Sequence, residues 1–390
     1  MFAAGAGVSR GLQGFLPEPE GPFGIGTRVV PILDPVRVDF AAEIPRPRRV
    51  LAQLWYPTRL SGPLTPMIGD PNLPIALEAA LGIPPVLGFL HSLGCHAQPS
   101  APPISGVRPV LIFLSGMAGF RQSNLFQVEH LVSHGYIVVG VDVPGFSANV
   151  EFSDGAQTPV LPARIAAPLV EQSIRRQEDP PRIGAREYPE GIVAELADDV
   201  GAVIDSLAEL SSRGVFTTVD LERIGIFGVS LGGITAAEVL RVDSRVTTGL
   251  MMDAPAPAAV AEEGLGGNAM WMTRNASSMR AERTRFGGWG EAEIAVHQSS
   301  LDTAVSKAPR AWRVDVNRLF HIDFTGAPYG SGALQQLVSG PLGGARAHAI
   351  LNTVTKAFFD HTLAGAPAAR LTAAVEALPE VAIAAAPESS

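Results

Sequence analysis

The chain has 390 residues, of which 46% are apolar and 17% are charged, so it can bury a large core and is not disordered as a whole. Its formal net charge of −9 is spread along the chain, and no run of lysines or arginines is long enough to follow a phosphate backbone. Nucleic acid is therefore excluded as an expected partner.

The cysteine and lysine content indicates which kinds of site and which source organism to expect. The single cysteine, Cys95, excludes an internal disulfide and a multi-cysteine metal site, and we expect it to be a small buried apolar residue. Lys307 and Lys356 are the only lysines, which together with the alanine and proline content indicates a GC-rich, bacterial genome. Residues 1–14 lack the basic-then-apolar pattern of a secretion signal, so we expect a cytoplasmic protein or the trimmed form of an exported one.

The N-terminal part of the chain is rich in β-formers and then in prolines. Two segments, Arg28–Phe40 and Arg49–Tyr56, are predicted to pair as an antiparallel edge. An apolar, proline-rich insertion follows at residues 61–107. Its most apolar part, Leu73–Leu90, is too interrupted by proline to span a membrane. We interpret it as a hydrophobic loop or a cap over a pocket, with ordinary core packing as the alternative.

Beyond this insertion, buried strands alternate with helices, which is typical of a mostly parallel sheet covered on both faces. We predict a single α/β domain over residues 1–390, ending in an alanine-rich, low-complexity tail after Ala364. The predicted strands are Val110–Leu114, Tyr136–Val141, Arg223–Phe227, Thr247–Met252, Ala269–Thr273 and Trp312–Val316. The predicted helices include Asn124–His134, Ile192–Leu210 and Glu291–Val305.

Two further insertions, at residues 146–191 and 254–268, follow the carboxyl ends of predicted strands. Ligands bind at this edge of an open α/β sheet. We therefore expect these segments, together with residues 61–107, to form the walls of a substrate site.

The pentapeptide Gly228-Val229-Ser230-Leu231-Gly232 lies between an apolar run and a helix-like stretch, residues 233–240. In a nucleophile elbow the serine adopts a strained backbone conformation at the apex of a strand–turn–helix, and small residues on either side let strand and helix approach. The motif in this context predicts a serine hydrolase with Ser230 as the nucleophile.

A serine hydroxyl needs a base, and the base needs an acid to orient it; in this fold the chain order is serine, acid, histidine. Asp253 is the first acid after Ser230 that ends a predicted strand. The alternative is that Asp253 is a helix cap or a turn residue before Pro255. Asp302 and Asp315 rank lower, because the first lies in a predicted helix and the second inside a predicted strand.

Four histidines follow the serine motif, and only His321 lies in a loop after the last predicted strand. We therefore predict His321 as the base. His297 and His361 lie in helical patterns, where a solvated or capping role is the ordinary interpretation. His348 lies in an alanine-rich segment that is expected to begin the C-terminal helix.

An oxyanion formed in acyl transfer needs backbone donors. The amide of Leu231 is the first expected donor, and the amide of Met117, in the small-residue loop Ser115–Gly119, is the second. A glycine-rich loop of this kind also binds phosphate in other proteins. This one has neither the lysine of a phosphate loop nor the spacing of a dinucleotide fingerprint.

Taken together, these motifs resemble the platelet-activating factor acetylhydrolase-like branch of the α/β-hydrolases. The family's nucleophile, acid and histidine fall on Ser230, Asp253 and His321. One departure is Ser115-Gly116, where the family usually has His-Gly. The matching stretches are residues 53–57, 109–120, 133–136, 198–200, 228–233, 252–254 and 320–324.

We therefore expect an α/β-hydrolase fold and a serine carboxylic ester hydrolase without metal or cofactor, acting through an acyl-enzyme. The expected small-molecule substrate is a hydrophobic ester with a short acyl group or a compact aromatic part. Alternatives with the same triad are an amidase or peptidase and a phospholipid or polyester hydrolase; a non-catalytic binding protein on the same fold is another. Peripheral contact with lipid surfaces through Leu73–Leu90 is a further expectation. The oligomeric state stays open.

Overall fold

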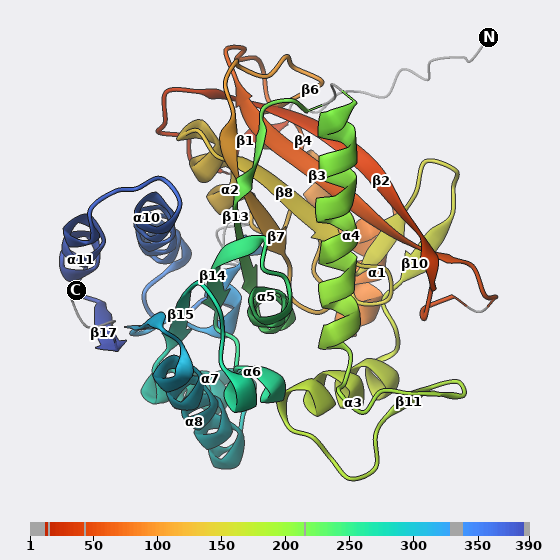
Figure 1. Cartoon of the computed structure of the whole chain (residues 1–390), viewed down its shortest axis with the longest axis vertical. Coiled ribbons are helices and arrows are strands. Elements are labelled where there is room, and N and C mark those ends of the chain that lie inside the picture. Colours follow the sequence, from red (N-terminus) through yellow and green to blue (C-terminus); the bar gives the residue numbers. More distant parts are fainter. Residues whose placement is uncertain (1–11, 15, 43, 214–215, 328–337, 386–390) are drawn as a thin grey trace.

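The computed structural model describes residues 12–14, 16–42, 44–213, 216–327 and 338–385, and its centre is a ten-stranded sheet (Figure 1). Residues 1–11 of the N-terminal segment considered above lie outside this described part. Six consecutive strands of the sheet are parallel, which confirms the predicted α/β class. They are β7 (Arg108–Leu114), β8 (Ile137–Asp142), β13 (Val219–Val229), β14 (Val246–Met252), β15 (Asn268–Arg274) and β16 (Arg310–Val316).

Strand β7 shows why these segments form a buried sheet. Val110, Ile112 and Leu114 belong to the hydrophobic cluster on one face of the sheet. Leu111 and Phe113 belong to the cluster on the other face. A strand of a parallel sheet is covered on both sides, so its sequence is apolar at every position.

Antiparallel strands extend the parallel block at both edges. β2 (Gly24–Val38) pairs antiparallel with β3 (Pro47–Thr58), as predicted, and β3 pairs antiparallel with β8. At the edges, β6 (Ala97–Pro99) joins β2 and β17 (Val381–Ala385) joins β16. The strand order is β17-β16-β15-β14-β13-β7-β8-β3-β2-β6.

The interpretation of the segment after Ala364 as a low-complexity tail is wrong. It contains helix α11 (Ala368–Glu376) and the edge strand β17. Leu371 and Val375, four residues apart, lie on one face of α11 and are buried in the core. This apolar spacing fixes the segment on the body of the protein despite its alanine content.

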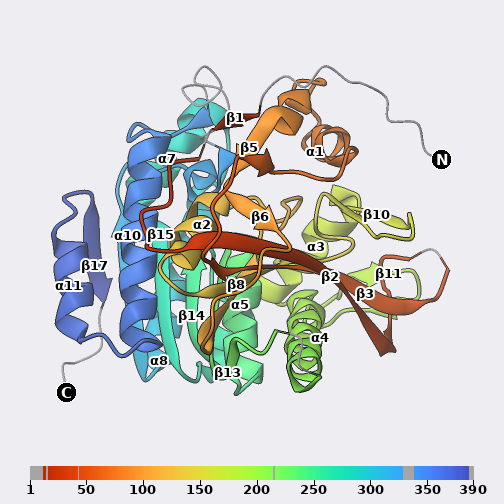
Figure 2. The same ribbon diagram turned by 90° about the horizontal axis from the view of Figure 1, so that it is seen from above.

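Helices cover both faces of the sheet; Figure 2 shows α10 on one side and α4 on the other. Residues of α3, α4, α5, α6 and α8 join the core on one face, and residues of α2, α10 and α11 join it on the opposite face. The helices other than α1 and α11 are α2 (Leu125–Ser133), α3 (Ala163–Ile174), α4 (Val193–Ser212), α5 (Leu231–Val242), α6 (Ala258–Glu263), α7 (Ala276–Phe286), α8 (Glu291–Lys307) and α10 (Gly344–Thr362).

Of the alternatives for Leu73–Leu90, a loop, a cap or core packing, the loop is wrong. The segment forms helix α1 (Leu73–Leu81) and then enters a 3-10 turn, η1 (Leu87–Ser92). Pro74 lies in the first turn of α1, where a backbone N–H has no helical acceptor, so this proline starts the helix instead of breaking it. Leu73 and Leu77 pack into the core, whereas other apolar residues of the segment are exposed.

Short strands lie in two of the three insertions, whereas residues 254–268 contain helix α6. β1 (Gln13–Gly14), β4 (Thr65–Pro66) and β5 (Leu93–Cys95) form a small sheet, and Cys95 is buried, as expected. Residues 146–191 contain α3 and two short hairpins. Their strands are β9 (Asn149–Glu151), β10 (Gln157–Pro159), β11 (Arg182–Ile183) and β12 (Arg186–Glu187).

Candidate active site

Ser230 connects β13 to α5 with φ of 56° and ψ of −124°. Such a conformation in a non-glycine residue costs about 1–3 kcal/mol and is concentrated at functional sites. The amide of Ser230 donates to the carbonyl oxygen of Met252 at 3.0 Å, which fastens the turn to the neighbouring strand β14. The strain is therefore held in place by the sheet.

The glycines of the motif are required by close contacts. A Cβ added at Gly228 would lie 2.4 Å from the backbone of Gly232. A Cβ added at Gly232 would lie 2.1 Å from the carbonyl oxygen of Leu114. Helix α5 and the strands β7 and β13 approach too closely for any side chain at these two positions, as expected of a nucleophile elbow.

Asp253 directly follows β14 and is 1% exposed. Its backbone also has a positive φ, 44°, and its amide donates to the carbonyl oxygen of Met272 on β15 at 2.9 Å. The carboxylate is thus fixed at the carboxyl edge of the sheet, one strand away from Ser230.

His321 opens the 3-10 turn η2 (His321–Phe324), which follows β16. Its Nδ1 lies 2.5 Å from Oδ2 of Asp253. Because an ionised carboxylate only accepts hydrogen bonds, Nδ1 is the donor and Nε2 is left free to take a proton. The imidazole is 39% exposed although its partner carboxylate is fully buried, so it reaches from the core toward solvent.

The turn that carries His321 is fixed by two carboxylates. The backbone amide of His321 donates to Oε1 of Glu282 on α7 at 3.0 Å. Oδ2 of Asp323 accepts from the amides of Phe320 and Gly340 at 2.7 and 2.8 Å. Burial raises the pKa of Asp323, and these amide donors act in the opposite direction.

The structure brings His321 and Asp253 into direct contact, but it does not show a hydrogen bond from the serine. Within the described residues the hydroxyl of Ser230 makes no side-chain hydrogen bond, and this residue is partly exposed. Nucleophile–base contacts are often long in a free enzyme and tighten when substrate binds.

Arg274, at the end of β15, is the cationic partner of Asp253. Its Nε lies 2.8 Å from Oδ2, in an ion pair whose N–H bond does not point along the contact. Burial alone would raise the pKa of Asp253, but the charge of Arg274 and the hydrogen bond from His321 outweigh it and hold the pKa well below its usual range. The surroundings of Asp253 therefore favour its ionised form.

The loop Ser115–Gly119 lies against the serine. A Cβ added at Gly116 would be 3.2 Å from Cβ of Ser230. The loop is fixed by a hydrogen bond from the amide of Ala118 to the carbonyl oxygen of Phe146, 2.7 Å long, and by one from Gly119 to Gly116, 2.9 Å long. Ala118 has a φ of 58°.

The two amides expected to hold an oxyanion are available. Leu231 is the first residue of α5, so its amide has no acceptor within the helix. Met117 is 43% exposed, and its amide has no acceptor among the described residues. Each therefore keeps a free N–H close to the serine.

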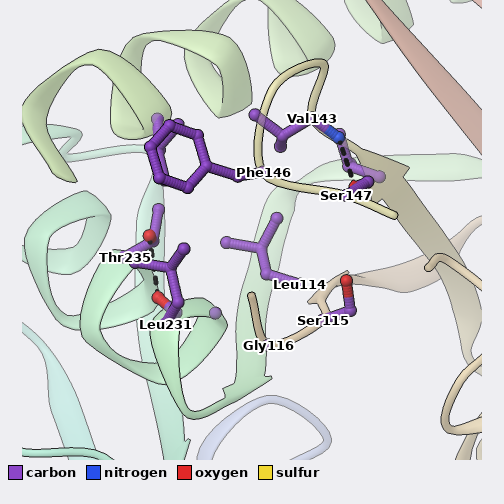
Figure 3. Close-up of a pocket in the computed structure, with 11 residues that line it drawn as sticks. Leu114, Ser115, Gly116, Val143, Phe146, Ser147, Leu231 and Thr235 are labelled. Atoms are coloured by element: carbon purple, nitrogen blue, oxygen red, sulfur yellow. Dashed lines mark hydrogen bonds between the residues drawn. The ribbon is translucent and has the colours of Figure 1, made fainter. Parts of the chain in front are cut away.

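A small cavity of about 20 Å³, room for about one water molecule, borders this loop (Figure 3). Gly116 and Leu231 form part of its wall, and most of the rest is apolar. Its polar contacts are internal: Thr235 donates to the carbonyl oxygen of Leu231 at 2.9 Å, and Ser147 accepts from the amide of Val143 at 2.9 Å. The lining residues are Leu114, Ser115, Gly116, Val141, Val143, Phe146, Ser147, Leu196, Leu231, Gly232 and Thr235.

The lower-ranked candidates lie elsewhere. Asp302 and Asp315 both pair with Arg313. His348 contacts the carbonyl oxygen of Thr325, and His361 that of Ala366. None of these side chains contacts Asp253 or Ser230 among the described residues.

A solvated or capping role for His297 is wrong. This residue is 1% exposed on the buried face of α8, together with Ile294, Leu301 and Ala304. That apolar spacing of three and four residues was the available signal. The sequence reasoning also missed Thr273 and Arg274, although they end β15 at the same sheet edge, and it missed Glu282, for which the sequence offers no signal.

Comparisons with known proteins bear on the fold and on the relatives of the chain. No protein-family model matches the chain. A 154-residue segment is 27% identical to platelet-activating factor acetylhydrolase from Bos taurus and covers 37% of this chain and 35%, about a third, of that protein. A ferulic acid esterase from Streptomyces cinnamoneus superposes with a TM-score of 0.72 and 27% identity over 96% of this chain and 99% of that one. The chain therefore has the α/β-hydrolase fold and is related to esterases of that fold, as its motifs indicated.

Proposed function

We propose that the chain is a serine carboxylic ester hydrolase that acts through an acyl-enzyme. The observation that carries this proposal is the 2.5 Å contact between His321 and Asp253 at the sheet edge where Ser230 is held in a strained turn. An imidazole oriented by a carboxylate, at the sheet edge that also carries a serine hydroxyl, is the arrangement that can activate a weak oxygen nucleophile once substrate brings the two together. The relation to esterases supports the choice of an ester bond.

In the proposed mechanism, Oγ of Ser230 attacks the ester carbonyl carbon while Nε2 of His321 takes the hydroxyl proton. Asp253 accepts from Nδ1 and stabilises the imidazolium. The amides of Leu231 and Met117 donate to the oxyanion, which then collapses to the acyl-enzyme as His321 protonates the leaving alcohol. Water, deprotonated by His321, releases the acid in the second half of the reaction.

The proposed substrate is a hydrophobic ester with a short acyl group or a compact aromatic part. The mostly apolar lining of the small cavity beside Gly116 and Leu231 supports the choice of a hydrophobic substrate, because these residues border the proposed oxyanion site. The names of the two relatives, a ferulic acid esterase and an acetylhydrolase, agree with substrates of modest size.

The test is hydrolysis of a panel of p-nitrophenyl esters that vary in acyl length, together with the anilide of the best acyl group. Ser230→Ala should abolish ester turnover, whereas Ser277→Ala, which changes an exposed serine of α7, should leave it unaltered. Near-wild-type turnover by Ser230→Ala would contradict the proposal. Preference for the anilide over the ester would replace it with an amidase.

We also propose peripheral contact with lipid surfaces through α1 and the residues after it. Ile75 and Leu81 are 65% and 59% exposed, and Ile83 and Val86, which follow in the same segment, are also exposed. In the described residues, no helix is long and apolar enough to span a bilayer. Co-sedimentation with phosphatidylcholine vesicles should fall when both Ile75 and Leu81 are changed to Ser; absence of binding by the wild type would contradict this proposal.

A further inference from the structure

His297 is a buried titratable group that the mechanism above does not use. Its Nε2 lies 2.9 Å from Oγ1 of Thr273, and the same Oγ1 lies 3.1 Å from Oδ1 of Asp253. All three side chains are buried, and they come from α8, from the end of β15 and from the end of β14. The three side chains form a hydrogen-bonded chain from His297 through Thr273 to Oδ1 of Asp253. His321 contacts the other carboxylate oxygen, Oδ2.

Hydrogen-bond chemistry fixes the direction of this hydrogen-bonded chain. The ionised carboxylate of Asp253 has no proton to give, so the single hydroxyl proton of Thr273 points at Oδ1. The hydroxyl oxygen then accepts, and Nε2 of His297 must be the donor. His297 is therefore the tautomer with a proton on Nε2 and none on Nδ1, and Nδ1 is buried without a hydrogen-bond partner among the described residues.

The surroundings keep His297 neutral. Burial lowers the pKa of His297 to about 4, although the charge of Asp253 acts in the opposite direction. The charged or titratable groups that face this cluster are Arg274 from β15, Glu282 from α7, Arg313 from β16 and His321 from η2. A neutral imidazole in one tautomer is a donor of fixed direction over the whole range in which an esterase of this type works.

We propose that Thr273 and His297 are positioning residues for the reaction proposed above, and that they fix the plane of the Asp253 carboxylate so that Oδ2 faces Nδ1 of His321. Arg274 does not replace them, because its ion pair supplies charge to Oδ2 while its N–H points elsewhere. If the hydroxyl of Thr273 is removed, Oδ1 of Asp253 keeps only one donor, the amide of Arg274 at 3.4 Å. This long hydrogen bond is too weak to fix the plane of the carboxylate by itself.

This inference rests on the proposed function, and its first test is kinetic. Thr273→Val keeps the shape of the side chain and removes the hydroxyl; kcat for the best p-nitrophenyl ester should fall about tenfold with KM unchanged, the size expected for one lost buried hydrogen bond. Thr273→Ser, which restores a hydroxyl, should recover most of kcat. Thr248→Val is the matched control, because Thr248 is buried at the opposite end of β14. Unchanged kcat in folded Thr273→Val would overturn the proposal.

A second readout does not depend on turnover. The short hydrogen bond between His321 and Asp253 should give a far-downfield proton resonance in the substrate-free protein. This resonance should move upfield or broaden in Thr273→Val and in His297→Leu, and it should be unchanged in Thr248→Val. A resonance identical in all variants would overturn the positioning role even if the protein is an active esterase. Absence of esterase activity in the wild type would instead remove the proposed function, while the resonance would still test the geometry.

Discussion

Two buried carboxylates, Asp253 and Asp199, both face arginine, yet they lie in regions of different character. Asp199, on α4, receives guanidinium groups on both oxygens: Arg48 lies 2.6 Å from Oδ2 and Arg37 lies 2.6 Å from Oδ1. Asp253 pairs with Arg274, but its shortest contact is with the partly exposed imidazole of His321.

The difference separates a structural ion pair from a reactive one. Arg48 is 1% exposed and also pairs with Asp39 at 2.8 Å, so this cluster fastens β3 to α4. The partly exposed partner Arg37 is a guanidinium, which keeps its charge and cannot take up a proton. At Asp253, the buried charge acts on a group that reaches solvent. A buried ion pair by itself is thus weak evidence of a functional site. What distinguishes Asp253 is that its carboxylate also contacts a titratable and partly exposed side chain, that of His321.

The largest expected effect comes from Asp253→Asn. An amide at this position stabilises no imidazolium and favours the wrong tautomer of His321, so kcat for a p-nitrophenyl ester should fall about ten-thousand-fold. Steady-state kinetics on the purified variant measures it. Asp199→Asn is the matched variant on the structural side and should leave kcat of the folded protein within about twofold. Equal losses in the two variants would erase the distinction between the regions.

The next effect is on stability. Arg48→Met leaves Asp39 and Asp199 buried without their main partner, and the free energy of unfolding should fall by about 3–5 kcal/mol. The neighbouring residue Arg49 pairs with the exposed Asp154, so Arg49→Met should cost less than about 1 kcal/mol. Urea denaturation compares them. A small loss in Arg48→Met, or a loss of kcat at a temperature where that variant is folded, would contradict the structural role.

The smallest expected effect is a change in the free energy of unfolding with pH. It compares two buried histidines, His297 near Asp253 and His348 away from it. Burial lowers the pKa of His297 to about 4 and that of His348 to about 3, below the value of about 6.5 in an unfolded chain. Between these values the unfolded state binds protons that the folded state excludes. The free energy of unfolding should therefore fall as the pH drops from about 6.5 toward 4.

His348 offers the test, because it lies on the face of the sheet opposite α8. His348→Gln should flatten the dependence of stability on pH by up to about 1.4 kcal/mol per pH unit, the contribution of one proton, without changing kcat. Urea denaturation between pH 7 and 5 measures the slope. A wild-type stability that does not change over this range would contradict the burial of neutral histidines.

Much of the fold was predictable because buried parallel strands and amphipathic helices leave strong local patterns. The predicted strand Thr247–Met252 differs from β14 by one residue at its start, and Ala269–Thr273 differs from β15 by one residue at each end. The errors have physical causes: Pro74 starts a helix instead of ending one, and Leu371 with Val375 is enough to dock an alanine-rich segment.

The candidate site was predictable only in part. Chain order and strand ends selected Asp253 and His321, and the structure places their side chains in contact. The contacts of Asp253 with Thr273 and Arg274, and that of Thr273 with His297, depend on the register between β14 and β15 and on how α8 packs, which no local pattern contains. The catalytic roles themselves stay proposals.

Labelling with a fluorophosphonate probe, followed by peptide mapping, tests the central claim most directly, because the probe reacts only with an activated serine. The account predicts one modified residue, Ser230, with no labelling of Ser230→Ala and strongly slowed labelling of Asp253→Asn. Absence of labelling in the native protein, or a modification at another serine, would contradict it.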